Sequence, residues 1–172
     1  LPINKISMSE KKIKNVFEEG PITPEKIANS IAHHQVKTNI GAHDIFLGQV
    51  RADEIDGKIV AAIEYSAYEE MANKVFDEIR ESAFDKYELT CAHIYHSKGV
   101  VKAGELCLFV FTSSKHRNMA FDACRYITEE IKAKALELAK QTKDSSKQTG
   151  IKNISQNELK DIENHLKIDI LD

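Results

Sequence analysis

The sequence lacks tryptophan and contains three prolines, seven glycines and three cysteines in 172 residues. The cysteines, Cys91, Cys107 and Cys124, are an odd number without the spacing of metal ligands, and each lies within an apolar pattern. We therefore expect buried, reduced thiols and a cytoplasmic protein. The histidines show no metal-ligand spacing either, and no glycine-rich phosphate loop or serine nucleophile motif is present, so the sequence predicts neither a metal nor a cofactor.

A large surplus of one charge and long apolar runs are also absent. The net charge is −3 at pH 7, which argues against nucleic-acid binding because such proteins normally carry a basic surplus. No apolar run approaches the length of a membrane span, and no segment resembles a signal peptide. With 42% apolar and 30% charged residues, the composition is that of an ordinary globular protein, long enough for one well-buried domain.

Helix and strand patterns do occur along the chain. Thr23 followed by Pro24 is typical of a helix start, and apolar residues recur at helical spacing in 69–84 and 117–142. Apolar or alternating segments predict strands at 12–17, 40–50, 59–68, 89–96 and 106–111, and Asp56-Gly57 predicts a turn. This order indicates an α+β fold with helices packed on a mixed or antiparallel sheet.

The chain divides into three predicted segments. Residues 1–7 precede Met8, which opens a stretch typical of a natural N-terminus, so they are predicted to be a cloning or processing remnant. Residues 8–142 form the main domain. Residues 143–172 are predicted to form a polar linker, rich in Lys, Ser and Gln, and a short terminal helix that begins with a capping-box pattern at 155–158.

The most informative segment is the junction between the apolar strand 106–111 and the long helix that follows. Hydroxyl residues end the strand, and His116 and Arg117 open the helix. Free backbone N–H groups and the helix dipole favour an anion at such a junction. The same helix carries Lys132 and Lys134 further along. The pattern predicts a pocket for a phosphate or a carboxylate with a lysine beside it.

Four segments in this order resemble the large, catalytic subunit of molybdopterin synthase, the MoaE family. They are G-Q-V-R at 48–51, E-Y-x-x-Y-x-x-M-A at 64–72, H-I-Y-H at 93–96 and H-R-x-x-A-F at 116–121. The resemblance covers residues 12–134, and its most specific parts are the second and fourth segments. It implies the α/β-hammerhead fold of that subunit.

The resemblance also implies a reaction and partners. The family converts a cyclic pyranopterin monophosphate into molybdopterin by installing two dithiolene sulfurs, and needs no metal of its own. The sulfur arrives as a thiocarboxylate on the C-terminal Gly-Gly of a small ubiquitin-like subunit, whose tail enters the pocket of the large subunit. Large subunits pair as a homodimer with one small subunit at each end. The resemblance therefore implies a heterotetramer, with no role for nucleic acid or membrane.

The resemblance also implies which residues form the site, by their position in the family's motifs. Arg51 matches an arginine after the first long strand, and Lys132 matches the lysine closest to the thiocarboxylate. His116 and Arg117 match a pair that is contributed to the neighbouring subunit's pocket. Two arginines and a lysine suit a substrate phosphate and a thiocarboxylate, because both are anions.

The chain departs from the family after Lys134. Relatives usually have Pro-x-Trp-Lys-x-Glu there, with a second pocket lysine, but here Ala139 stands at the lysine position and no proline or tryptophan is present. Lys134 and Lys140 are the candidates to replace it as substrate-binding residues. We therefore expect a sulfurtransferase with reduced activity. The alternatives are a non-catalytic paralogue that binds the ubiquitin-like partner, and a small anion-binding regulatory domain without sulfur chemistry.

Overall fold

The computed structural model of the protein describes residues 11–141 and 150–169, with side chains left out at 136, 138–141 and 165–169. The predicted remnant at 1–7 and most of the predicted linker, 143–149, lie outside the described residues. None of the helices in the described part has the length and apolar character that a membrane span requires.

In the described part of the chain, seven strands form one mixed sheet, which confirms the α+β fold class. The elements in chain order are β1 (Phe17–Glu19), α1 (Pro24–Gln35), β2 (Ala42–Gln49), β3 (Glu54–Ile55), β4 (Lys58–Ser66), α2 (Glu69–Lys86), β5 (Cys91–Lys102), β6 (Leu106–Ser114), α3 (Arg117–Gln141), β7 (Gly150–Ser155) and α4 (Gln156–Asp169). The main path of the sheet is β2-β6-β5-β4-β3. β1 adds in parallel to β5, and the other described strand pairs are antiparallel.

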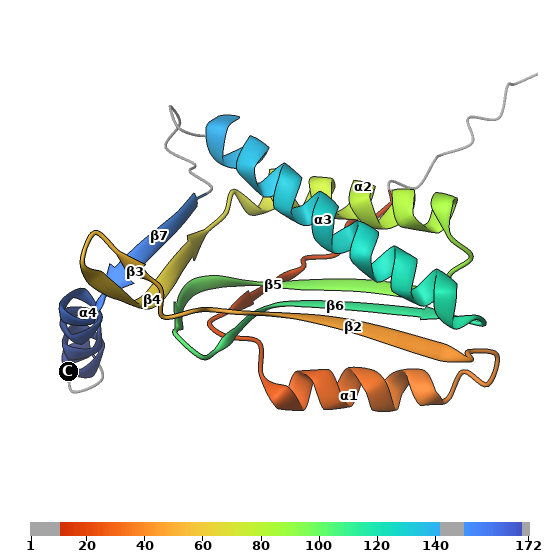
Figure 1. Ribbon diagram of the computed structural model, residues 1–172, viewed down its shortest axis with the longest axis horizontal. Coiled ribbons are helices and arrows are strands. Elements are labelled where there is room, and N and C mark those ends of the chain that lie inside the picture. Colours follow the sequence, from red (N-terminus) through yellow and green to blue (C-terminus); the bar gives the residue numbers. More distant parts are fainter. Residues whose placement is uncertain (1–10, 142–149, 170–172) are drawn as a thin grey trace, which may run out of the picture.

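The helices cover the two faces of this sheet unequally. Figure 1 shows α2 and α3 together over one face of β2, β5 and β6, and α1 alone on the opposite face. The larger core lies under α2 and α3, where Phe76, Ile79, Ile127 and Ile131 pack on Ile94. Under α1 the buried apolar residues are Ile22, Phe109 and Phe111, with half-buried neighbours around them.

Local signals explain where several elements begin. The Thr23 side chain accepts a hydrogen bond from the Lys26 backbone N–H, and Pro24 occupies the first turn of α1, as predicted. The predicted turn at Asp56-Gly57 joins β3 to β4, and both residues have positive φ, 52° and 72°. Asp and Gly are the residue types that tolerate this backbone conformation best, so the turn sets the register of the hairpin.

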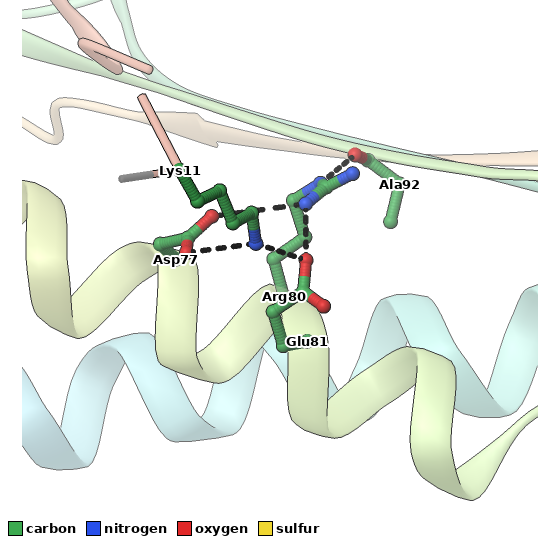
Figure 2. A network of polar contacts seen from close by, with 5 residues as sticks. All are labelled: Lys11, Asp77, Arg80, Glu81 and Ala92. Carbon is green, nitrogen blue, oxygen red and sulfur yellow. Dashed lines mark hydrogen bonds and ion pairs between the residues drawn. The ribbon is translucent and has the colours of Figure 1, made fainter. Parts of the chain in front are cut away.

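The first predicted strand, 12–17, was misplaced, and β1 begins only at Phe17. The Val16 backbone N–H donates to the Asn73 side chain, so it is not available to a neighbouring strand. Figure 2 shows how the segment before β1 is held instead: Lys11 pairs with Asp77 and Glu81 of α2. Arg80, between these carboxylates, donates to the Ala92 carbonyl of β5 at 3.1 Å. The network joins the N-terminal segment, α2 and the sheet.

The C-terminal segment contains a strand that the sequence pattern did not reveal. β7 pairs with β4 over six residues, from Val60 opposite Ser155 to Ser66 opposite Gly150. The predicted terminal helix is confirmed as α4. Its capping box is formed, because Ser155 N–H donates to Glu158 and Glu158 N–H donates to the Ser155 hydroxyl.

Candidate active site

A largely apolar cavity of about 620 Å³ lies between α3 and the sheet. From α3 it receives Thr128, Ile131 and Lys132, and the opposite wall comes from β2, β4 and β7. Lys132 is exposed and Thr128 is half-buried, so the ammonium group stands at the rim of an otherwise apolar space. Residues from elements far apart in sequence complete the lining: Phe17, Phe46, Gly48, Tyr65, Phe76, Leu108, Gly150 and Ile151.

Polar groups lie along the strand side of the cavity. Burial lowers the pKa of His96, whose Nδ1 lies 2.7 Å from the Ser97 carbonyl. Burial also raises the pKa of Tyr65 and of Cys107, and the Cys107 thiol donates a hydrogen bond to the Gly48 carbonyl at 3.5 Å. At neutral pH the imidazole, the phenol and the thiol are therefore uncharged. Within the described residues, the Ser97 hydroxyl is buried without a hydrogen-bond partner, so this wall has a free donor and no fixed charge.

Arg51 lies beside this cavity, in a pocket of about 240 Å³ that shares Gln49 and Tyr65 with it. The guanidinium group donates two hydrogen bonds to Asp53, at 3.0 and 2.8 Å, and the carboxylate raises the pKa of Arg51. The side chain of Arg51 is 81% exposed. An anion that binds Arg51 bidentately therefore has to compete with Asp53 for the same N–H groups.

His116 and Arg117 lie elsewhere, in a separate pocket of about 360 Å³ with Gly41, Lys115 and Asn118. Both side chains are exposed at the first turn of α3, where free backbone N–H groups favour an anion. Gly41 is required at the wall of this pocket, because a Cβ there would lie 2.2 Å from the Lys115 carbonyl oxygen. The contact fixes the start of β2 against the start of α3.

Within one chain the predicted residues therefore form two groups. Arg51 and Lys132 line adjoining pockets, whereas His116 and Arg117 belong to the other end of α3. Fifteen residues separate Arg117 from Lys132 along the helix, which corresponds to about 22 Å at 1.5 Å per residue. A small molecule held by Lys132 cannot also touch Arg117 of the same chain.

Lys134 and Lys140 are the two candidates to replace the missing pocket lysine. Lys134 is exposed, pairs with Glu137 at 3.2 Å, and does not line the cavity. The hydrogen bond to that carboxylate raises the pKa of Lys134. The side chains of Ala139 and Lys140 lie outside the described residues, although α3 continues through both positions. The continuous helix agrees with the lack of proline in this segment.

Several lining residues escaped the sequence argument. Tyr65, His96 and Ser97 lie on adjacent strands, and their convergence depends on strand register, not on spacing along the chain. Gly150 and Ile151 could not be found because the strand that contains them was missed. The signal for Tyr65 and His96 was present, since both fall inside the segments that carry the resemblance.

Comparison with known proteins gives the family. The sequence model described as "MoaE protein" matches residues 17–134. The chain belongs to this family. A molybdopterin synthase catalytic subunit from Thermoplasma volcanium is 37% identical over 114 residues, which cover 66% of this chain and 80% of the relative. The corresponding subunit from Pyrococcus abyssi is 42% identical over 95 residues, 55% of this chain.

The match to the Pyrococcus abyssi protein spans 64% of that protein's length. Among solved structures, the molybdopterin synthase of Staphylococcus aureus superposes with a TM-score of 0.61 at 25% sequence identity. The superposition covers 84% of this chain and 94% of the other. The chain therefore has the same fold as this molybdopterin synthase.

Proposed function

We propose that this chain is the catalytic subunit of a molybdopterin synthase, a sulfurtransferase. It transfers sulfur from the thiocarboxylated C-terminus of a small ubiquitin-like subunit to a cyclic pyranopterin monophosphate, forming the dithiolene. The observation that carries this proposal, beside family membership, is the position of Lys132 at the rim of the apolar cavity, next to the pocket of Arg51.

The cavity suits an extended carrier tail that ends in an anion. Its walls are apolar and include Gly48 and Gly150, which leave room for a backbone to lie close to the strands. Lys132 is the cation that meets the thiocarboxylate at the rim. Once a bound tail has displaced water from the apolar cavity, the charge of Lys132 would act on it with less screening than in bulk water. The ammonium can stabilise charge that develops at the attacked carbon, or donate a proton to it.

The substrate phosphate is assigned to arginines from two chains. Arg51 lies beside the Lys132 cavity, but Arg117 is about 22 Å along α3 from Lys132. We therefore propose a homodimer in which His116 and Arg117 of one subunit complete the pocket of the other. A two-fold axis makes two such pockets at once.

The dimer surface is assigned to the edge strand β2 and the first turns of α3. Exposed apolar side chains lie here, with Phe46 39%, Leu47 40% and Phe121 50% exposed. Strand β6, which precedes the His116-Arg117 junction, lies between β2 and β5, and its Phe109 and Phe111 are fully buried. Strand β6 therefore packs behind β2, inside the chain, and is not itself part of the proposed dimer surface.

Turnover is proposed to be slower than in relatives with two pocket lysines. Ala139 provides no charge, and Lys134 is already paired with Glu137 outside the cavity lining. A cytoplasmic location and the boundary of the main domain at residue 142 stay predictions from the sequence.

The deciding experiment is single-turnover product formation with thiocarboxylated small subunit and pyranopterin precursor. We expect Lys132→Ala to slow sulfur transfer by roughly 100-fold or more, as for loss of a positioned proton donor, while dimerisation and carrier binding are retained. Lys134→Ala is the matched control and should keep the wild-type rate, whereas Lys140→Ala tests the remaining candidate lysine. Carrier binding without product in every protein, wild type included, would instead identify a non-catalytic paralogue.

A second measurement addresses the arginines. Arg51→Ala and Arg117→Ala should each weaken precursor binding by roughly 10- to 100-fold, as expected for loss of one charge-assisted contact. Asp53→Asn is the matched control for Arg51 and should bind the precursor at least as tightly as wild type, since it removes the competing carboxylate. Isothermal titration with thermal unfolding would separate the effects, because an arginine that stabilises the fold would lower the melting temperature and leave affinity unchanged.

A further inference from the structure

A second group of chemically active side chains lies on the α1 face of the sheet, away from the Lys132 cavity. It consists of His34 from α1 and of Cys91 and His93 from β5. The two imidazole nitrogens and the thiol sulfur all lie within 4.8 Å of one another. His34 and Cys91 are buried, at 5% and 6% exposure, and His93 is half-buried. Two residues apart on β5, Cys91 and His93 project from the same side of the sheet.

Hydrogen bonds already orient these groups as ligands. His34 Nδ1 lies 2.6 Å from the Ser30 carbonyl oxygen, which can only accept, so Nδ1 carries the proton. The lone pair of His34 is therefore on Nε2, and this atom lies 2.9 Å from Nε2 of His93. A carbonyl behind a histidine is the usual support for a metal-binding imidazole, because it fixes both the tautomer and the ring plane.

We propose that His34, Cys91 and His93 form a zinc site that joins α1 to the sheet. Two imidazoles and one thiolate are ligands that Zn²⁺ binds well, and Zn²⁺ accepts three protein ligands with water in the fourth position. Within the described residues these three side chains form the one group of this kind. The fourth position is assigned to water.

The geometry needs only small shifts. Tetrahedral zinc with bonds of about 2.0–2.1 Å to nitrogen and 2.3 Å to sulfur places two nitrogens about 3.3 Å apart and nitrogen and sulfur about 3.6 Å apart. The two Nε2 atoms must separate by about 0.4 Å from their 2.9 Å distance. The sulfur lies within 4.8 Å of the nitrogens, so it must approach by at most about 1.2 Å. Side-chain rotations accommodate both shifts.

Zinc binding requires two protons at this site to move. The proton on Nε2 of His93 moves to Nδ1 of the same ring, which frees the Nε2 lone pair without net release. The Cys91 thiol releases one proton to solvent as it becomes a thiolate ligand. Lys37, which lies 2.8 Å from the Cys91 sulfur, can remain as a hydrogen-bond donor to the thiolate.

An entry path and space for the water ligand are present. His34 and His93 line an open pocket of about 690 Å³ that also contains Asn29, Ser30 and His33. Glu18 and Glu25 lie on its rim together with Lys14 and Lys26, so the entrance carries charges of both signs. The site connects a helix with little apolar cover to the middle of the sheet, so the bound ion acts as a structural link.

The test is metal binding by the full chain after chelator treatment and dialysis. Competition titration should give one Zn²⁺ per chain, and Zn²⁺ should raise the melting temperature. Co²⁺ should show tetrahedral visible bands and a thiolate charge-transfer band. Cys91→Ser should lose the charge-transfer band, and His34→Gln or His93→Gln should weaken Zn²⁺ binding by roughly 100-fold or more, since even outer-shell changes cost about 10–100-fold.

His43→Gln and Cys124→Ser are the matched controls, one nearby histidine and one other buried cysteine, and both should bind Zn²⁺ as wild type does. Wild type that binds no Zn²⁺ at micromolar concentration would overturn the proposal. So would a Co²⁺ complex without a thiolate band, a result that holds even if the ligand variants fail to fold. Equal affinity in wild type and in folded His34→Gln and His93→Gln would overturn it as well.

Discussion

The two faces of the sheet use the same strands for different purposes. On the α2 and α3 face, β5 contributes Ala92 and Ile94 to an extensive apolar core, and a cavity remains beside that core. On the α1 face the alternate residues of the same strand are Cys91, His93 and Tyr95, and the apolar core is small. Strand alternation therefore separates a face that is stabilised by burial from a face that is rich in polar ligands.

The largest expected effect tests where the stability comes from. Ile127→Ala, at a fully buried position on the sheet side of α3, should lower the free energy of unfolding by about 2–5 kcal/mol because it leaves a cavity. Ile31→Ala, at a half-buried position on α1, should lower it by about 1 kcal/mol. Urea unfolding of both variants at pH 7 measures the difference. Equal losses would show that the two faces contribute alike.

A second comparison uses pH. Burial beside Phe17, Tyr65 and Phe76 lowers the pKa of His96 below the usual 6.5. The unfolded chain then binds this proton more tightly than the folded chain, so stability should fall as the pH drops below about 6.5. His96→Gln should lose less stability than wild type between pH 7.5 and pH 5.

The His96→Gln variant should still lose some stability as the pH falls. Burial lowers the pKa of His93, on the α1 face, to about 4, and this histidine is present in both proteins. Glu129 and Lys132 also line the cavity near His96 and are unchanged in the variant. The measurement is thermal unfolding in metal-free buffer at several pH values. Parallel curves for wild type and His96→Gln would contradict the assigned burial effect.

The smallest expected effect is a gain in stability. Ser97→Ala removes a buried hydroxyl that has no partner among the described residues, so the free energy of unfolding should rise by up to about 1 kcal/mol. Ser114→Ala is the matched control, since its hydroxyl donates to the Glu88 carbonyl at 2.6 Å, and it should lose about 1 kcal/mol. A loss of sulfur transfer in the stabilised Ser97→Ala would show that substrate uses this hydroxyl.

Much of this fold could be predicted because its signals are local. The Thr23 cap, the Asp56-Gly57 turn and the apolar stripes of α2 and α3 each specify an element through residues that are close in sequence. The position of Lys132 on the cavity side of α3 also follows from helical spacing, once Ile127 and Ile131 define the buried stripe.

The parts that escaped prediction depend on contacts between distant residues. β7 is short, has exposed residues at 151–153, and becomes a strand because β4 offers it a free edge. The approach of His34 to Cys91 and His93 depends on how α1 crosses the sheet, and no spacing in the sequence encodes it. The predicted site divides into two groups because α3 is long and carries Arg117 and Lys132 in different pockets. The sequence does not show where these pockets lie.

The pairing of β7 with β4 also has a consequence for synthesis on the ribosome. Partners in this pair are 84 or more residues apart, as for Ser66 and Gly150, whereas strands β1 to β6 are all complete by residue 114. The main sheet can therefore assemble while the later residues are still being added, since chains are made at about 5–20 residues per second. Gly150 and Ile151 line the cavity, so this wall of the pocket forms after the rest of the sheet. Under the proposed function, the carrier tail meets a complete pocket only once β7 has emerged.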